Sequence, residues 1–202
     1  MLVIGLTGNF GTGKTTVSQM LAELGAVVID ADKLGHELLQ PDSQAYREIL
    51  AAFDNSFLKP NGEIDRQELG KLVFTEPTAL TQLNQIMHPK MCELTKQKIE
   101  QHRKQGAKVL VLEAALLIEA GWTPLVDQVW LTVASPVTIV KRLKAARGLS
   151  QEQVSSRLIT QMPSEEKAKR ADIVIDTDCS LDELRTRVTE LWQNLCRDRK
   201  WD

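Results

Sequence analysis

The sequence has few cysteines and no excess of charge of either sign. Its three cysteines, Cys92, Cys179 and Cys196, are widely spaced and form no C-x-x-C pair. They therefore fit neither a disulfide framework nor a zinc knuckle, and we expect a reducing cytoplasm as the compartment. The 25 basic and 27 acidic side chains give a formal net charge of −2. Because no general positive field draws the protein to nucleic acid, we expect no nucleic-acid partner, and any phosphate must be recognised locally.

Long hydrophobic runs, internal repeats and low-complexity tracts are also missing. The apolar segment 1–7 is too short to span a bilayer and lacks the basic-then-apolar order of a signal peptide. We expect it to form a buried strand, and we expect no membrane partner. A chain of 202 residues is long enough for one well-buried core with a small subdomain around it.

Five short apolar runs are typical of parallel strands that are covered on both faces of a sheet. They occupy residues 2–7, 26–30, 109–112, 129–133 and 173–175. Helical spacing follows the first run from Lys14 to Leu24, where Gly25 favours a helix end. A last amphipathic helix is expected over 181–196. The pattern predicts an α/β fold with a five-stranded parallel sheet.

Two long segments with helical spacing interrupt this order of strands. Residues 33–106 form the first insertion, and we expect turns in it at Pro41, Pro60, Pro77 and Pro89. Residues 136–169 form the second and are rich in Lys, Arg, Gln and Ser. Its position between the fourth and fifth strands suggests a mobile lid.

The segment from Gly8 to Thr15 matches the motif G-x-x-x-x-G-K-[ST] between a strand and a helix, which is the context that the motif needs. Lys14 would reach the β- and γ-phosphates of a nucleotide, and Thr15 would offer its hydroxyl to Mg²⁺. The motif predicts ATP or GTP as ligand, and ATP is favoured because no N-K-x-D guanine motif follows. The predicted nucleotide-binding residues are Gly8, Asn9, Phe10, Gly11, Thr12, Gly13, Lys14, Thr15 and Thr16.

Acidic residues follow the second apolar run at Asp30 and Asp32. Strand alternation would place both on one side, at the carboxyl edge where open α/β sheets bind ligands. Asp32 could accept the proton of an attacking hydroxyl, orient that hydroxyl or hold a Mg²⁺-bound water. It could equally cap a helix that begins at Lys33. Position alone leaves both alternatives open.

Glu113 ends the third apolar run, as the acidic residue of a Walker-B element does when it steadies Mg²⁺ through water. Many strands end in an acid, so a purely structural role stays open. The basic residues of the second insertion, Lys141, Arg142, Lys144 and Arg147, could clamp ATP phosphates or form a solvated face. The pair His88-Pro89 most simply indicates a turn before a helix.

Taken together, these motifs resemble the dephospho-CoA kinase family over nearly the whole chain. The resemblance lies in the P-loop and its strand, in the acids that follow the second strand, and in blocks farther along. The matching segments are residues 4–8, 28–32, 62–66, 69, 73–74, 88–89, 116–119, 161 and 171–176.

The resemblance implies a three-layer P-loop kinase unit over residues 1–202. It also implies ATP-dependent phosphorylation of the ribose 3′-hydroxyl of dephospho-CoA, the last step of coenzyme A synthesis, with Mg²⁺ as helper. Residues 33–106 would be the CoA-binding insertion, and residues 136–169 the lid over ATP. The implied catalytic residues are Asp32, Lys14 and Arg142; the implied acceptor-binding residues are Asp32, Arg66, His88 and Leu116; and the implied metal-binding residues are Thr15 and Glu113.

The sequence departs from the family pattern at several of these positions. Ala115 and Ile118 stand where the family typically has proline and phenylalanine, and Glu113 stands where aspartate is more common. The second lid arginine is displaced by one position to Arg147, and Thr177 replaces a usual asparagine.

Two other functions remain open on sequence. A kinase of the same fold could act on a nucleoside monophosphate, shikimate or a sugar acid, although the Asp-Arg and His-Pro blocks and the large insertion favour a bulky adenosine-containing acceptor. The chain could also be a nucleotide-binding regulator. Against the regulator stand the intact Lys14 and Thr15, together with Asp32, because a sensor needs no acid to activate a hydroxyl.

Overall fold

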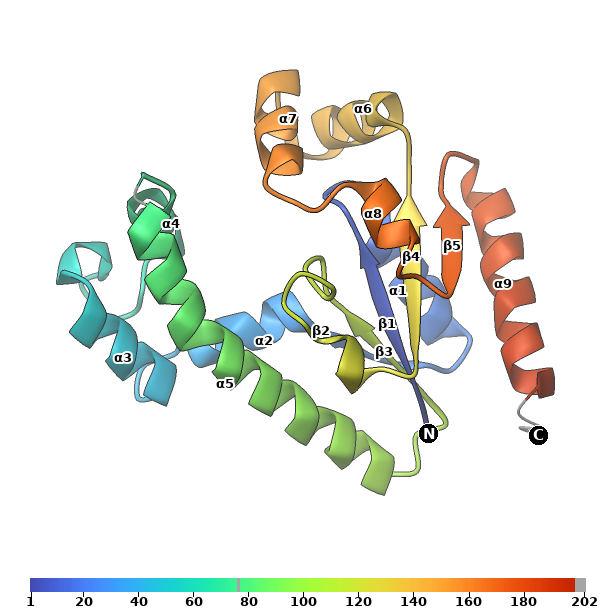
Figure 1. Cartoon of the computed structure of the whole chain (residues 1–202), viewed down its shortest axis with the longest axis horizontal. Helices are drawn as coiled ribbons and strands as arrows, with labels where there is room; N and C mark the ends of the chain where they lie inside the picture. Colours follow the sequence, from blue (N-terminus) through green and yellow to red (C-terminus); the bar gives the residue numbers. More distant parts are fainter. Residues whose placement is uncertain (76, 199–202) are drawn as a thin grey trace. The chain divides into compact units, whose positions relative to one another are not determined.

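A five-stranded sheet with the strand order β2-β3-β1-β4-β5 carries the P-loop (Figure 1). The computed structural model describes residues 1–75 and 77–198. Within them the chain divides into two units: the first contains residues 1–29 and 99–198, and the second contains residues 30–75 and 77–98. The strands are β1 Leu2–Gly8, β2 Val27–Asp30, β3 Val109–Glu113, β4 Gln128–Val133 and β5 Ile173–Asp176. All five predicted strands are confirmed.

The first strand lies at the centre of the sheet and pairs in parallel with both neighbours. Leu6 is opposite Glu113 of β3, and Gly8 is opposite Thr132 of β4. Because parallel strands end at the same edge, this register places the P-loop, Glu113 and the end of β4 side by side.

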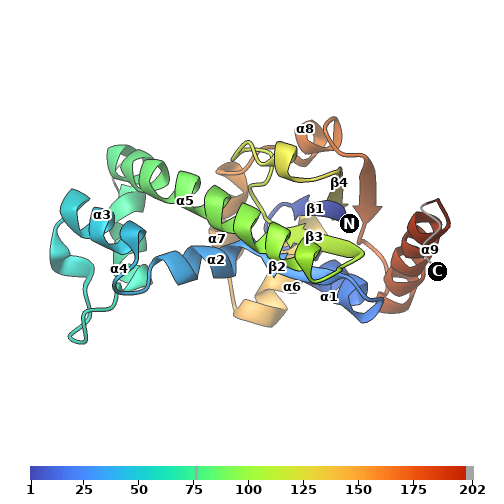
Figure 2. The ribbon, with the colours of Figure 1, turned by 90° about the horizontal axis from the view of Figure 1, so that it is seen from below.

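Helices α1 (Lys14–Glu23) and α9 (Leu181–Asp198) cover one face of the sheet and contact each other (Figure 2). Alternate residues of β1 point into this layer, where they pack with residues of both helices. The buried core contains Leu2, Ile4, Leu6, Val17, Leu21, Leu184 and Val188. Both helices are therefore confirmed.

The opposite face of the sheet is covered by the chain that follows β3. Gly5 points to this side, and a Cβ added there would lie 3.0 Å from the Leu117 side chain and 3.1 Å from that of Val126. The short helix η2 (Thr123–Leu125) belongs to the same segment, and α8 (Ser164–Ala168) contacts β4. With helices on one face and these segments on the other, the three-layer fold is confirmed.

The insertion after β4 is helical, as predicted. Helix α6 (Pro136–Arg147) is capped by Ser135, whose hydroxyl accepts from Thr138 N, and α7 (Gln151–Ile159) has a capping box at Ser150. The two helices pack together around Ile139, Leu143 and Val154.

The second unit has its own hydrophobic core. Its elements are α2 Ala31–Leu38, α3 Gln44–Ala52, η1 Asn55–Phe57, α4 Arg66–Thr75 and most of α5 Pro77–Lys104. The core residues are Ala45, Ile49, Phe57, Ile64, Leu69, Val73, Ala79 and Met87. An antiparallel bridge between Leu58 and Ile64 flanks the turn at residues 60–62.

Two local predictions in this unit are wrong. Helix α2 begins at Ala31, and the Asp30 side chain caps it by accepting from Asp32 N and Lys33 N. Asp32 is therefore not the cap, and strand alternation does not relate it to Asp30, because the backbone is already helical at Ala31.

The pair His88-Pro89 does not form a turn before a helix. Pro89 lies inside α5, where its ring is exposed. Met87 and Met91, four residues apart, both pack on the core of the second unit, so an uninterrupted helix keeps both on one face. Pro77, where a turn is predicted, is the first residue of α5. In the described ranges, no helix combines the length and the apolar character needed to cross a bilayer.

Candidate active site

The P-loop links β1 to α1 and contains two glycines, Gly8 and Gly13, at positions that do not accommodate a side chain. Gly13 precedes α1 with a left-handed φ of 85° and offers no side-chain cap, so the first N–H groups of the helix face the loop. A Cβ at Gly8 would lie 2.3 Å from Thr132 Oγ1. The Thr12 hydroxyl ties the loop together, 2.8 Å from both Asn9 O and Thr132 Oγ1.

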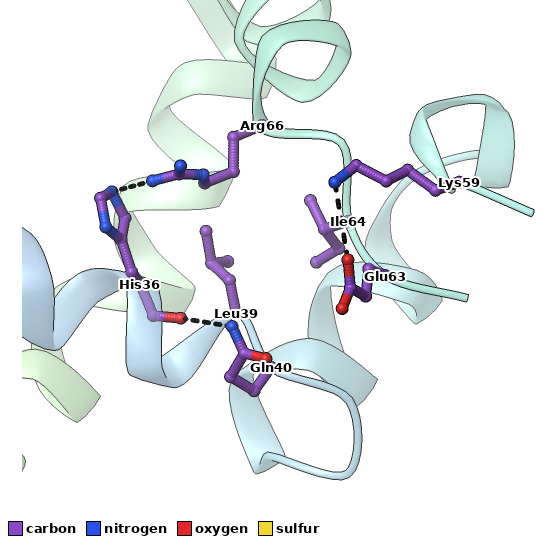
Figure 3. Close-up of a pocket in the computed structure, with 7 residues that line it drawn as sticks. All are labelled: His36, Leu39, Gln40, Lys59, Glu63, Ile64 and Arg66. Carbon is purple, nitrogen blue, oxygen red and sulfur yellow. Dashed lines mark hydrogen bonds and ion pairs between the residues drawn. The ribbon is translucent and has the colours of Figure 1, made fainter. Parts of the chain in front are cut away.

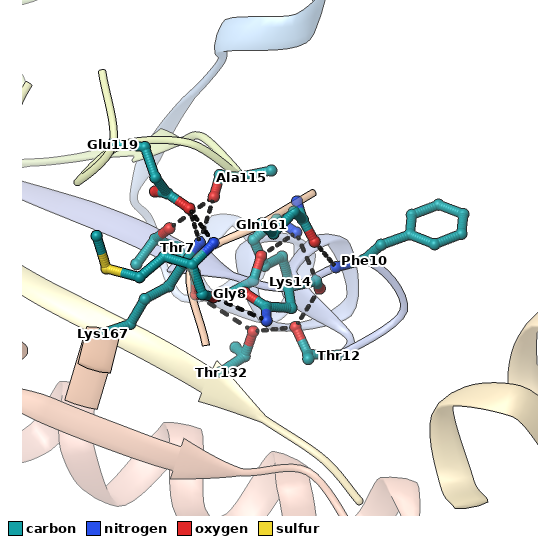
Figure 4. A network of polar contacts seen from close by, with 12 residues as sticks. Thr7, Gly8, Phe10, Thr12, Lys14, Ala115, Glu119, Thr132, Gln161 and Lys167 are labelled. Atoms are coloured by element: carbon teal, nitrogen blue, oxygen red, sulfur yellow. Dashed lines mark hydrogen bonds and ion pairs between the residues drawn. The ribbon is translucent and has the colours of Figure 1, made fainter. Parts of the chain in front are cut away.

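Lys14 lies across this loop. Its Nζ donates to Gly8 O at 2.8 Å, with Asn9 O at 3.5 Å (Figure 4). The ammonium group therefore sits where backbone N–H groups of the loop and the start of α1 also gather. This is the arrangement that P-loop proteins use for the phosphates of a nucleotide.

A hydroxyl–carboxylate cluster adjoins the P-loop. Thr15 Oγ1 donates to Glu113 Oε1 at 2.7 Å, and Ser18 Oγ donates to Glu113 Oε2 at 2.6 Å. The structure therefore brings together the two residues predicted to bind metal. Sequence reasoning missed Ser18, although it lies three residues after Thr15 and so on the same face of α1.

Arg142 of α6 reaches the P-loop through Thr177. Its Nη1 donates to Thr177 Oγ1 at 3.0 Å and its Nη2 to Thr177 O at 2.5 Å. The Thr177 hydroxyl is fully buried and lies 2.9 Å from Thr12 O, to which it donates. Thr177, which stands where asparagine is usual, thus connects the predicted lid arginine to the loop. The side chain of the other candidate, Arg147, lies outside the described residues.

A cavity of about 560 Å³ opens beside Arg142. Its lining residues are Thr138, Lys141, Arg142, Ala145, Asp178 and Cys179. Asp178 Oδ2 accepts a 2.7 Å bond from Ser135 N at the start of α6. Hydrogen bonds from Ser135, with a smaller contribution from the Arg142 charge, hold the pKa of Asp178 below its ordinary value. Two cations and one carboxylate thus border a space large enough for a nucleoside.

The second unit contains a separate cavity of about 440 Å³ that joins Asp32 and Arg66 to an apolar wall. Its lining residues are Asp32, Gly35, His36, Leu39, Arg66, Leu69, Gly70, Leu83, Met87 and Met91. Asp32 and Arg66 are both exposed. Two predicted acceptor-side residues therefore share one cavity within this unit.

A smaller cavity of about 200 Å³ shares His36, Leu39 and Arg66 with the larger one (Figure 3). Gln40, Lys59, Glu63 and Ile64 complete its lining. Arg66 is hydrogen-bonded to the His36 ring, and Lys59 Nζ lies 3.5 Å from Glu63 Oε2. Sequence reasoning missed His36 and Lys59. Helical spacing puts His36 four residues after Asp32 and could have found it, whereas no such signal points to Lys59.

Two predicted acceptor residues lie elsewhere. His88 is half-buried in α5 next to Met87, and within the described part of the chain it lines neither cavity. Leu116 belongs to the first unit, in the turn after β3, and is 44 % exposed.

The phosphate-binding loop, the hydroxyl–carboxylate cluster and the arginine-bearing helices after β4 define a P-loop kinase. Solved structures agree on the fold. A shikimate kinase from Bacteroides thetaiotaomicron matches over 95 % of this chain and 98 % of its own, with a TM-score of 0.54 at 14 % identity. At that identity the likeness shows the fold alone.

The family is shown by nearer relatives. A family model described as dephospho-CoA kinase matches residues 2–183. The dephospho-CoA kinase of Geobacter sulfurreducens is 45 % identical over 95 % of this chain and 98 % of its own. A solved dephospho-CoA kinase from Campylobacter jejuni covers 98 % of both chains with a TM-score of 0.74 and 27 % identity. The chain therefore belongs to the dephospho-CoA kinase family, whose kinase activity makes ATP the nucleotide for this P-loop.

Proposed function

We propose that the chain transfers the γ-phosphoryl group of ATP to the ribose 3′-hydroxyl of dephospho-CoA, giving coenzyme A and ADP in the last step of coenzyme A synthesis. The observation that carries this proposal is the combination of family membership over nearly the whole chain with an intact P-loop and Asp32. A chain that had lost catalysis would not need to keep both.

The first unit supplies the phosphoryl donor. Lys14 and the N–H groups of residues 8–16 would hold the β- and γ-phosphates, and Arg142 would neutralise charge that develops during transfer. The cavity beside Arg142 would receive the nucleoside of ATP. Its borders, Thr138 and Asp178, come from α6 and from the loop after β5.

Thr15 and Glu113 are the residues that would hold Mg²⁺. The Glu113 carboxylate has the Thr15 hydroxyl at 2.7 Å from one oxygen and the Ser18 hydroxyl at 2.6 Å from the other, and hard oxygen ligands are those that Mg²⁺ prefers. The described residues contain no group of three or more His, Cys, Asp or Glu side chains that could hold a metal. A donor set of one or two protein ligands fits an ion that is otherwise bound by phosphates and water. When bound, Mg²⁺ would neutralise charge on the β- and γ-phosphates.

The second unit, and with it the predicted insertion 33–106, would receive the acceptor. Its larger cavity has an apolar wall of leucine and methionine side chains that suits the adenine ring of dephospho-CoA. Asp32 would accept the proton of the 3′-hydroxyl as that oxygen attacks. Arg66 offers a planar, bidentate cation for the acceptor's diphosphate. His88 and Leu116 remain predicted supports of the acceptor side.

Residues 136–169 would form the lid. Closure of α6 and α7 over ATP would exclude water, which otherwise competes with the acceptor hydroxyl for the phosphoryl group. We also propose a cytoplasmic location, because Cys92, Cys179 and Cys196 are all free thiols.

The test is coupled ADP release with Mg-ATP across a panel of dephospho-CoA, AMP, adenosine, shikimate and gluconate. Lys14→Ala serves as the blank. Turnover on dephospho-CoA alone is the expected result. Turnover only on another acceptor would support kinase activity but reject dephospho-CoA as the substrate. ATP binding without turnover on any acceptor would favour a nucleotide-binding regulator.

A further inference from the structure

Lys167 carries a buried ammonium group that none of the roles above uses. It lies in α8 with a side chain that is 0 % exposed, 2.9 Å from Glu119 Oε1 and 2.8 Å from Ala115 O (Figure 4). A buried charge is costly unless it is paired and hydrogen-bonded. Both partners lie in the turn that follows β3, the strand that ends in Glu113.

Glu119 extends this contact to the P-loop. Its Oε1 also accepts from Met162 N at 3.2 Å, and Met162 O accepts from Asn9 Nδ2 at 3.2 Å. Asn9 is only 6 % exposed, and its Oδ1 has no partner among the described residues. The Met162 carbonyl is therefore the contact that orients the Asn9 side chain.

A second hydrogen bond joins the same segment to the loop. Phe10 N donates to Gln161 Oε1 at 2.8 Å. Gln161 and Met162 thus contact the two P-loop residues that directly follow Gly8. Residues 161–163, which connect α7 to α8, lie against the loop on this side.

A third contact begins at the strand itself. Thr7 Oγ1 donates to Ala115 O at 3.2 Å, so that one carbonyl accepts from both Thr7 and Lys167. Lys167 therefore shares the acceptor Ala115 O with Thr7, the last residue before Gly8. It shares the acceptor Glu119 Oε1 with Met162, which belongs to the segment that contacts Asn9 and Phe10.

We propose that Lys167 is a positioning residue for ATP. Its ion pair with Glu119 fixes residues 161–163 against the P-loop, and the bonds from Asn9 and Phe10 then hold the loop in its phosphate-binding conformation. A loop held in this way loses less conformational entropy when phosphate binds. This inference rests on the ATP-binding half of the proposed function and not on the identity of the acceptor.

The test combines three variants with a matched control. Lys167→Met removes the ammonium and keeps an unbranched buried side chain, and Glu119→Gln keeps an oxygen for Met162 N while removing the charge. Gln161→Ala removes only the acceptor of Phe10 N. Lys169→Met is the control, because Lys169 is a nearby surface lysine whose side chain is 68 % exposed and paired with Glu166. Each protein is assayed for the Kd of ATP without acceptor by calorimetry, for both KM values and for Tm.

Lys167→Met is expected to raise the Kd and the KM for ATP about 10-fold, as the loss of more than one hydrogen bond would. The KM for dephospho-CoA should stay within about twofold of the parent value. Glu119→Gln should act in the same direction but less, and Lys169→Met should match the parent protein.

An unchanged Kd for ATP in folded Lys167→Met would overturn the inference. Equal rises of both KM values would do the same, because a purely structural role moves them together. If Lys167→Met does not fold, the Gln161→Ala variant provides the test. An unchanged Kd for ATP in that variant would reject the proposal that residues 161–163 hold the P-loop. Because the Kd of ATP is measured without acceptor, it tests the role of Lys167 even if the protein does not phosphorylate dephospho-CoA.

Discussion

The Thr15 hydroxyl donates a 2.7 Å hydrogen bond to the carboxylate of Glu113, which lies 98 residues away in the sequence. Ser18, one turn further along α1, binds the other carboxylate oxygen. Two hydroxyls therefore fix the orientation of a carboxylate beside the P-loop. This geometry arises because β3 pairs directly with β1, with Glu113 opposite Leu6.

Glu113→Ala should lower kcat about 100-fold and raise the Mg²⁺ concentration needed for half-maximal turnover, because an oriented carboxylate that steadies the ion is lost. Turnover measured across a Mg²⁺ titration checks both effects. Ser18→Ala, which leaves the Thr15–Glu113 contact in place, should have a much smaller effect. A Mg²⁺ dependence that is the same in Glu113→Ala and the parent protein would remove Glu113 from the metal site.

Arg142→Lys should raise the KM for ATP and lower kcat, together about 10-fold or more in kcat/KM, since a lysine cannot reproduce the two-pronged contact with Thr177. Thr177→Val, which keeps the shape and loses the hydroxyl, should raise the KM for ATP more than it lowers kcat. Steady-state kinetics with varied ATP concentration separates the effect on the KM for ATP from the effect on kcat. Val137→Ala, at a position of α6 that is 78 % exposed, is the matched control, and parent-like kinetics in Arg142→Lys would count against a role in phosphate neutralisation.

Asp32→Asn should lower turnover about 10²-fold to 10⁴-fold while ATP binding is kept, because the amide cannot accept the proton of the acceptor hydroxyl. Turnover and the Kd of ATP, measured on the same sample, check this expectation. Asp30→Asn is a close control, since asparagine caps helices about as well as aspartate. Equal losses in both variants would assign the effect to the start of α2 and not to the Asp32 carboxylate.

The Asp178 contact predicts a pH-dependent contribution to stability. Hydrogen bonds from Ser135 lower the pKa of Asp178 in the folded protein, so the contribution is fully present above the ordinary aspartate pKa of about 4 and is lost as pH falls through the depressed value. Asp178→Ala should therefore unfold more easily than the parent protein at about pH 7, with a difference that shrinks below about pH 4. Urea unfolding across this range measures it; a difference that does not change with pH would contradict the assignment.

Much of the fold was predictable because its signals are local. The buried strands read as continuous apolar runs, and the motif from Gly8 to Thr15 was recognisable between a strand and a helix. Helices α1 and α9 were likewise predicted from the 3.6-residue spacing of their apolar positions. Membership of the family then followed from motifs spread along the chain.

Local rules failed where packing or a neighbouring side chain decided the outcome. Proline disfavours the helical conformation in the residue before it, yet Pro89 lies within α5 because Met87 and Met91 pack on one core. Asp32 has the right chemistry for a helix cap, but the Asp30 carboxylate caps α2 instead, because it accepts hydrogen bonds from the N–H groups of Asp32 and Lys33.

By itself, the sequence determined the five strands, the helices α1 and α9, where the phosphate-binding loop lies and which residue types the chemistry can use. Only the tertiary structure decided that Ser18 joins Thr15 at Glu113, that Thr177 links Arg142 to Thr12, and that Lys167 braces the P-loop. The physical reason is that hydrophobic period and turn chemistry act between residues close in sequence, whereas these hydrogen bonds span 35 to 165 residues. They form only after the strand order β2-β3-β1-β4-β5 has brought the carboxyl ends of the strands to one edge.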